Sequence, residues 1–230
     1  MTSSAPPSTT EPETPTFRVA VWDLPVRLVH WLIVLLVPFS WWTAREEMLE
    51  WHYRSGLLIL GLVVFRLVWG LIGSSTARFA SFVRGPRHIV NHLRGRREFV
   101  IGHNPLGALS VLALLFMLAV QVGLGLFSAD EDGLLSGPLS GLIGEETVES
   151  VTELHETSFE VLKWLIVLHV AAILFYLLVR RKNLVGPMVG GEAAAPPRTP
   201  PMVAAPASRL AIAVLTAFAT MSLVWWIGEG

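Results

Sequence analysis

The chain has 230 residues, of which 53% are hydrophobic and 15% charged, and its formal net charge is −1. This composition is typical of membrane proteins with several spanning helices and excludes an ordinary soluble domain, while the near-neutral charge gives no reason to expect a nucleic-acid partner. Cysteine is absent, which excludes disulfides, iron–sulfur clusters and covalently attached haem, so histidine, methionine or carboxylate would have to hold any metal.

The beginning of the chain lacks the basic segment and following apolar run of a signal peptide. We therefore expect residues 1–20 to form a disordered cytoplasmic tail. The first predicted span covers residues 26–42, and His30 lies near its beginning. Asp23 and Pro25 precede this span and suit the start of a helix.

A short acidic turn leads to the second predicted span, residues 51–72, which has His52 near its start. Both spans come close to the ~20 residues that cross about 30 Å of hydrocarbon. The next segment, residues 73–106, is basic, with six arginines against one glutamate. Within it we expect a short interfacial helix at residues 86–94, since a proline begins and a glycine follows that stretch.

The third predicted span, residues 107–127, contains no histidine, although His103 stands just ahead of it. Residues 128–153 then form an acidic loop with seven carboxylates and no lysine or arginine. The fourth span, about residues 159–179, is followed by two arginines and a lysine. A Pro- and Ala-rich linker leads from there to a last apolar run, residues 210–227, long enough for a fifth span.

Two histidines share the helix predicted over residues 151–180, which includes the fourth span. His155 and His169 are fourteen positions apart, so they lie on one helix face, roughly 21 Å apart along the axis. That separation is too long for one metal ion and suits two stacked cofactors, one near each membrane surface.

The basic segments follow spans two and four, so the positive-inside rule places them and the N-terminus in the cytoplasm and the C-terminus in the periplasm of a bacterial inner membrane. His52 and His155 then lie near the periplasmic surface, and His30 and His169 toward the cytoplasm. A haem iron between two helices needs one imidazole from each side, which a four-helix bundle supplies. The predicted fold is therefore an all-α membrane protein, a four-helix transmembrane bundle holding two b haems plus a fifth C-terminal helix.

Each histidine also has a plainer interpretation. A single histidine at a helix end, such as His30 or His52, is more often an interfacial hydrogen-bonding residue than a ligand. The cross-helix pairing is what favours ligation. His169 is the strongest single candidate, because it lies ten positions inside an apolar run where no solvent can satisfy its ring.

Six motifs carry a resemblance to a known family: WDLPVRLVHW, WHYRSG, FRLVWG, FVRGP, GHNPLG and LHETSFEVLKWLIVLHV. Together they resemble the prokaryotic cytochrome b561 family, which includes the b-type subunits of nickel–iron hydrogenases, over residues 21–188. The resemblance implies a dihaem unit at residues 21–185, with two non-covalent b haems ligated by His30, His52, His155 and His169. The linker, residues 186–208, and the additional helix, residues 209–230, depart from the family's four-helix pattern and receive no family role.

Several residues near these histidines are candidates for the anionic haem propionates. Arg66 lies within an apolar run, where an arginine needs an anionic partner, at the depth of the cytoplasmic haem. A lipid headgroup contact explains Arg27 equally well, and Arg54 is a candidate at the periplasmic haem with the same alternative. Gly56, one turn after His52, leaves room either for a porphyrin face or for close helix packing.

The remaining polar candidates have less specific patterns. His88 and His92 have metal-ligand spacing, but no carboxylate or cysteine accompanies them within the short helix, so solvated or propionate-contacting loop residues are the better interpretation. The roles open to His103 are capping, propionate contact and quinone binding. Glu160 and Lys163 are three apart and can neutralise each other, with a proton relay as the alternative.

The sequence thus predicts transmembrane electron transfer between the quinone pool and a redox partner. The acidic loops favour a basic periplasmic partner such as a c-type cytochrome. The alternatives are a membrane b subunit of a hydrogenase-like complex and a self-contained superoxide or quinone oxidoreductase, so enzymatic activity stays open. For the fifth helix the options are covering a haem face, binding a partner subunit and forming a homodimer.

Overall fold

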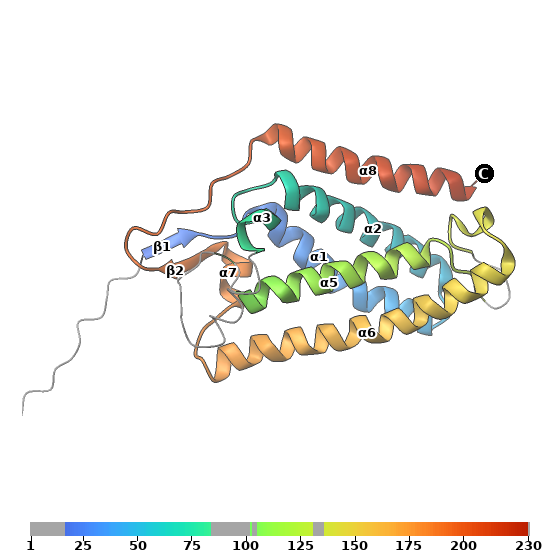
Figure 1. The fold of residues 1–230 in the computed structure, drawn as a ribbon, viewed down its shortest axis with the longest axis horizontal. Helices are drawn as coiled ribbons and strands as arrows, with labels where there is room; N and C mark the ends of the chain where they lie inside the picture. The colour runs from blue at the N-terminus through green and yellow to red at the C-terminus, as the bar shows by residue number, and fades with distance from the viewer. Residues whose placement is uncertain (1–16, 84–101, 103–104, 131–135, 230) are drawn as a thin grey trace, which may run out of the picture.

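The computed structural model describes residues 17–83, 102, 105–130 and 136–229, and it consists mainly of long helices lying alongside one another (Figure 1). The interfacial helix predicted at residues 86–94, with His88 and His92, lies outside the described residues, and so does His103. Five of the described helices are long and apolar enough to cross a membrane, which confirms a mostly helical, multi-pass membrane protein. They are α1 (Leu24–Arg45), α2 (Leu49–Ile72), α5 (Pro105–Gly125), α6 (Glu145–Leu178) and α8 (Ala207–Glu229).

Asp23 fixes the beginning of α1, as its position in the sequence predicts. Its Oδ1 accepts a hydrogen bond of 2.8 Å from the backbone N–H of Val26, which satisfies one of the free donors in the first turn. Pro25 occupies that turn, where its missing N–H costs nothing. The Asp23 Oδ2 accepts a second hydrogen bond of 2.8 Å from the indole of Trp69, so one carboxylate both caps α1 and ties it to the end of α2.

Helix α6 begins earlier than predicted, at Glu145 instead of residue 151. Two glutamates, Glu145 and Glu146, lie in its first turn, where their charges stabilise the positive end of the helix dipole. Part of the predicted acidic loop is therefore helical. His155 consequently lies ten residues inside the helix, where the backbone holds its position firmly.

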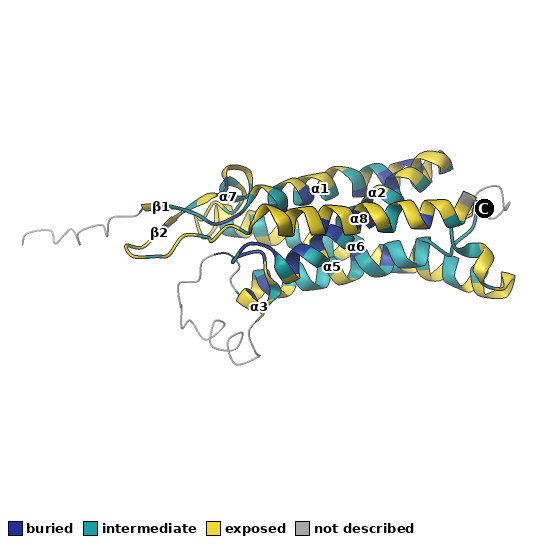
Figure 2. Ribbon diagram, turned by 90° about the horizontal axis from the view of Figure 1, so that it is seen from above, coloured by how far each residue is buried: buried dark blue, intermediate teal, exposed yellow. Residues whose placement is uncertain are grey.

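A buried cluster joins α1, α2, α5 and α6 near the middle of the molecule. Its members are apolar side chains with little solvent exposure: Val37, Ile59, Val63, Leu118 and Leu162. Trp41 of α1 stacks on Phe159 of α6, with 6.5 Å between the ring centroids. Burial is concentrated along these inward faces, and the outer faces are exposed, as expected for helices surrounded by lipid (Figure 2).

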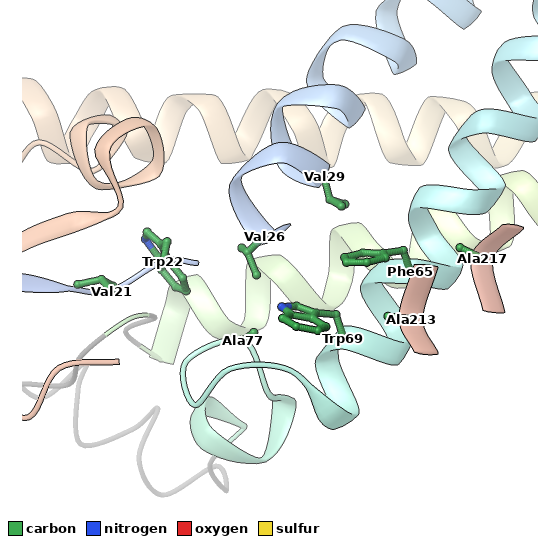
Figure 3. Packing of buried hydrophobic residues seen from close by; sticks show 9 residues of the cluster. All are labelled: Val21, Trp22, Val26, Val29, Phe65, Trp69, Ala77, Ala213 and Ala217. Carbon is green, nitrogen blue, oxygen red and sulfur yellow. The ribbon is translucent and has the colours of Figure 1, made fainter. Parts of the chain in front are cut away.

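A second buried cluster lies where the strands, the start of α1 and the end of α2 meet (Figure 3). Trp22, Trp69 and Phe65 provide its aromatic rings, and Ala213 and Ala217 of α8 complete it. The short helix α3 (Phe79–Phe82) packs beside it, with the Phe79 ring occupying the space that a side chain at Gly70 would need.

Helix α8 packs along α2 through small residues. A Cβ at Gly61 of α2 would collide with the Met221 side chain, so the glycine is what allows α8 to come this close. At the other end of α2, the Arg209 guanidinium donates a hydrogen bond of 3.2 Å to the Ile72 carbonyl. Gly61 is nine positions from His52, so α8 covers the face of α2 opposite His52.

Two short strands differ from the predicted tail and linker. β1 (Phe17–Ala20) pairs antiparallel with β2 (Glu192–Ala195), and Phe17 lies opposite Ala195. A short helix, α7 (Val185–Gly190), precedes β2. The tail predicted over residues 1–20 therefore contains a strand, and the linker predicted over residues 186–208 contains ordered elements, because backbone hydrogen bonds between distant segments leave no periodic pattern in either one.

Candidate functional site

His52 of α2 and His155 of α6 lie next to each other in an edge-to-face arrangement, with their ring centroids 6.2 Å apart and their planes at 80°. A metal–imidazole bond is about 2 Å long and a ring nitrogen lies about 1.2 Å from its centroid, so opposed imidazoles on one ion have centroids roughly 6.4 Å apart. The observed separation fits that arrangement. The predicted pair therefore meets in the structure, and ligation of one iron by both rings stays a prediction.

The backbone of α1 orients His52. The His52 Nδ1 donates a hydrogen bond of 2.8 Å to the Ser40 carbonyl, and the Ser40 hydroxyl lies 3.1 Å from the same nitrogen. A proton on Nδ1 leaves the lone pair on Nε2, which is the usual arrangement for a ligating histidine. Ser40 is buried, so this hydrogen bond is shielded from solvent.

Helix α5 orients His155 in the same way. The His155 Nδ1 donates a hydrogen bond of 3.0 Å to the Gln121 carbonyl, and the Gln121 side-chain nitrogen lies 3.2 Å from both ring nitrogens. The ring also packs on Gly125, where a Cβ would come within 2.9 Å of the His155 Cε1. A glycine on α5 is therefore needed for the ring to approach this closely.

His30 of α1 and His169 of α6 are the second predicted pair, and the electrostatic interaction between their rings indicates that they are neighbours. The His169 Nδ1 is hydrogen-bonded to the Ser110 hydroxyl of α5 at 3.2 Å. The His30 Nδ1 is buried and has no hydrogen-bond partner among the described residues. A buried ring nitrogen without a partner is costly, so this nitrogen needs a hydrogen-bond partner from outside the described residues.

Gly56 lies beside open space. No atom of the described residues would lie within 4 Å of a Cβ built at this position, one turn after His52. Close packing of another described helix against Gly56 is therefore not what the structure shows, and room for a porphyrin face beside His52 stays a prediction. The described residues also contain no group of three or more histidines, aspartates or glutamates that could hold a metal ion. Pairs of histidines suit haem, because the porphyrin supplies the other four nitrogens.

Arg66 is buried in α2, with 8% of its surface exposed. Its guanidinium lies 5.1 Å from the centroid of the Phe79 ring and donates a long hydrogen bond of 3.4 Å to the Ala77 carbonyl. Its charge also interacts with that of Asp23. Arg66 thus has an anionic neighbour within the protein, and contact with a propionate remains a prediction.

The other two predicted arginines contact the protein itself. The Arg27 guanidinium donates to the Val189 carbonyl of α7, which ties the start of α1 to the segment after α6. Arg54 is exposed and pairs with Glu50 at 2.6 Å. Contact of either residue with a propionate is likewise a prediction.

Sequence reasoning missed three residues that hold the histidines: Ser40, Ser110 and Gln121. The third span was described as offering no ligand, yet α5 supplies hydrogen-bond partners to both histidines of α6. A glutamine inside an apolar run was a signal that could have been used. Glu160 and Lys163 form an exposed ion pair of 2.6 Å, consistent with mutual neutralisation.

Comparison with known proteins assigns the family. The family model described as prokaryotic cytochrome b561 matches residues 21–191, which include α1 to α7 and leave out both strands and α8. No curated protein and no solved structure matches the chain. The matched segment contains both histidine pairs, and the family binds b haems. This chain therefore belongs to the prokaryotic cytochrome b561 family.

Proposed function

We propose that the chain carries electrons across the membrane through two b haems, one held by His52 and His155 and the other by His30 and His169. The family suggests transmembrane electron transfer by a b-type cytochrome. The observation that carries the two-haem proposal is the 6.2 Å separation of the His52 and His155 rings, together with the proximity of His30 on α1 to His169 on α6.

The haems would supply reversible one-electron chemistry. The protein would hold the haems in place and keep small ligands away from the iron. With two histidines holding each haem, no position on the iron would be left for small ligands such as oxygen. The histidines need no acid–base role. Their neighbours Ser40, Ser110 and Gln121 fix how the rings point.

Two pairs at different depths give the electron a path through the bilayer. His155 and His169 are fourteen residues apart on α6, or roughly 21 Å along the helix axis. Their partners on α5, Gln121 and Ser110, are eleven residues apart in the opposite direction, as expected for two antiparallel helices. Helix α6 thus sets the spacing of the two proposed haems.

The proposed electron partners are the quinone pool and a basic periplasmic protein such as a c-type cytochrome. The beginning of α6 carries Glu145, Glu146, Glu149 and Glu153, all exposed, and no basic residue accompanies them there. An exposed acidic end attracts a basic partner over several ångströms and speeds its docking. The positive-inside rule places this end in the periplasm.

Haem quantification of the purified full-length protein tests the proposal. We expect two b haems per chain, both reduced by a quinol. His169→Ala should remove one haem and leave the other, because His52 and His155 would still ligate theirs. His155→Ala should remove the opposite haem, which serves as the matched control.

A single haem in the unmodified protein would contradict the proposal. Retention of both haems in His169→Ala would contradict the pairing of His30 with His169.

A further inference from the structure

Gln121 is the buried polar side chain of α5, with 9% of its surface exposed in an otherwise apolar helix. A buried amide is costly unless its donors and acceptor are used. In a membrane helix the cost is higher, since no water reaches the site. A glutamine at this position therefore needs partners, and the structure provides them on α6.

Both the backbone and the side chain of Gln121 reach His155. The carbonyl accepts from Nδ1 at 3.0 Å, and the side-chain nitrogen lies 3.2 Å from each ring nitrogen. The Gln121 Oε1 accepts a hydrogen bond from the Ser158 hydroxyl, which holds the amide in place. The His155 ring is therefore contacted on one side by an anchored amide and on another by Gly125.

These contacts restrict rotation of the His155 ring about its Cβ–Cγ bond. The opposing ring, His52, is fixed separately by the Ser40 carbonyl of α1. The angle of 80° between the two ring planes is thus set by two helices, α1 and α5, that carry neither histidine of this pair.

We propose that Gln121 is a positioning residue that fixes the plane of the His155 ring and so tunes the haem held between His52 and His155. This inference rests on the proposed function. The side chain of Gln121 holds the His155 ring in the plane in which Nδ1–H reaches the Gln121 carbonyl. A ligand whose Nδ1–H is firmly hydrogen-bonded is more basic and favours ferric iron, which lowers the reduction potential, so loosening the ring raises that potential. When the planes of the two ligating imidazoles are nearly perpendicular, the EPR g values of a low-spin ferric haem are also more widely separated. The reduction potential and the g values of this haem would therefore both depend on the orientation of the His155 ring.

The experiment compares midpoint potentials and EPR spectra of the haem-loaded full-length protein with those of Gln121→Leu. We expect the potential of one haem to rise and its largest g value to fall, while the second haem keeps both values. The backbone carbonyl survives the substitution, so the change isolates the side chain.

Ser158→Ala provides a second test if Gln121→Leu loses its haem. It removes the anchor of the amide and leaves Gln121 in place, so we expect shifts in the same direction but smaller. Ser110→Ala is the matched control on α5, because Ser110 contacts His169 and should alter the other haem.

The inference is overturned if Gln121→Leu or Ser158→Ala keeps two haems with unchanged potentials and g values, or if both haems shift equally. That outcome differs from failure of the proposed function, which would appear as fewer than two haems in the unmodified protein.

Discussion

At Gly56 the missing side chain leaves open space one turn from His52. A porphyrin bound through His52 would need such a space beside the helix. Gly56→Leu would fill it with a branched side chain, so we expect loss of the haem held by His52 and His155 and retention of the other. Haem content and the reduced absorption spectrum of the purified variant measure this.

Gly123 offers the matched control, because it has equally open surroundings on α5. It lies two residues from Gln121, which places it on the other side of that helix. Gly123→Leu should therefore keep both haems. Equal haem loss in both variants would show that bulk in this half of the bundle, instead of the space beside His52, causes the effect.

The meeting of His52 with His155 could be predicted from the sequence, because the positive-inside rule and their positions in the spans place both rings at one depth. The orientation of the histidine rings could not be predicted in this way. The acceptor for His52 is the backbone carbonyl of Ser40, and every residue has a carbonyl, so no sequence pattern marks it. Gln121 is different, since a polar residue in an apolar helix was visible but was not given a role.

Helix α8 packs on the outside of the four-helix bundle, against α2. Its buried residues Ala213 and Ala217 are four apart and small, which lets its backbone approach α2. The contact lies on the face of α2 opposite His52. This packing therefore does not place α8 over a haem held by His52.

Gly61→Ala tests the packing of α8 on α2. The added methyl group would displace the flexible Met221 side chain, so we expect a modest loss of stability of about 1 kcal/mol, at the low end for an overfilled interface. Thermal unfolding in detergent measures it, and both haems should remain.

Combining Gly61→Ala with Met221→Ala should recover most of that loss, because the shorter side chain removes the collision. Additive losses in the double variant would show that the two residues do not meet in the membrane.

The extents of elements were predicted less well than their existence. Apolar length identified all five long helices, but the start of α6 was placed six residues too late because carboxylates suggested a loop. In fact glutamates at a helix N-terminus stabilise it. β1 and β2 could not be predicted, since each is short and gains its hydrogen bonds only from the other.

At the scale of the whole molecule, charge is separated between the two ends. The acidic end includes the beginning of α6, and three basic residues follow the end of that helix: Arg180, Arg181 and Lys182. The positive-inside rule converts this asymmetry into an orientation, with the basic end in the cytoplasm.

The chain has no cysteine, so single introduced thiols can test the orientation without background. Leu142, 67% exposed before α6, and Lys182, exposed after it, lie beyond opposite ends of that helix. In spheroplasts we expect a membrane-impermeant maleimide to label Leu142→Cys, and to label Lys182→Cys only after lysis. The reverse pattern would contradict the proposed topology and the periplasmic partner.

The pairing of β1 with β2 has a consequence for how the protein is made. Ala20 leaves the ribosome 172 residues before Glu192, the residue it pairs with, is synthesised. At roughly 5–20 residues per second, that interval is about 9–34 s. The four helices that carry and orient the histidines are complete before β1 can find its partner, and α8 follows later still. Joining of the strands and arrival of α8 are therefore the closing steps of biogenesis, added to a bundle whose histidine pairs can already have met.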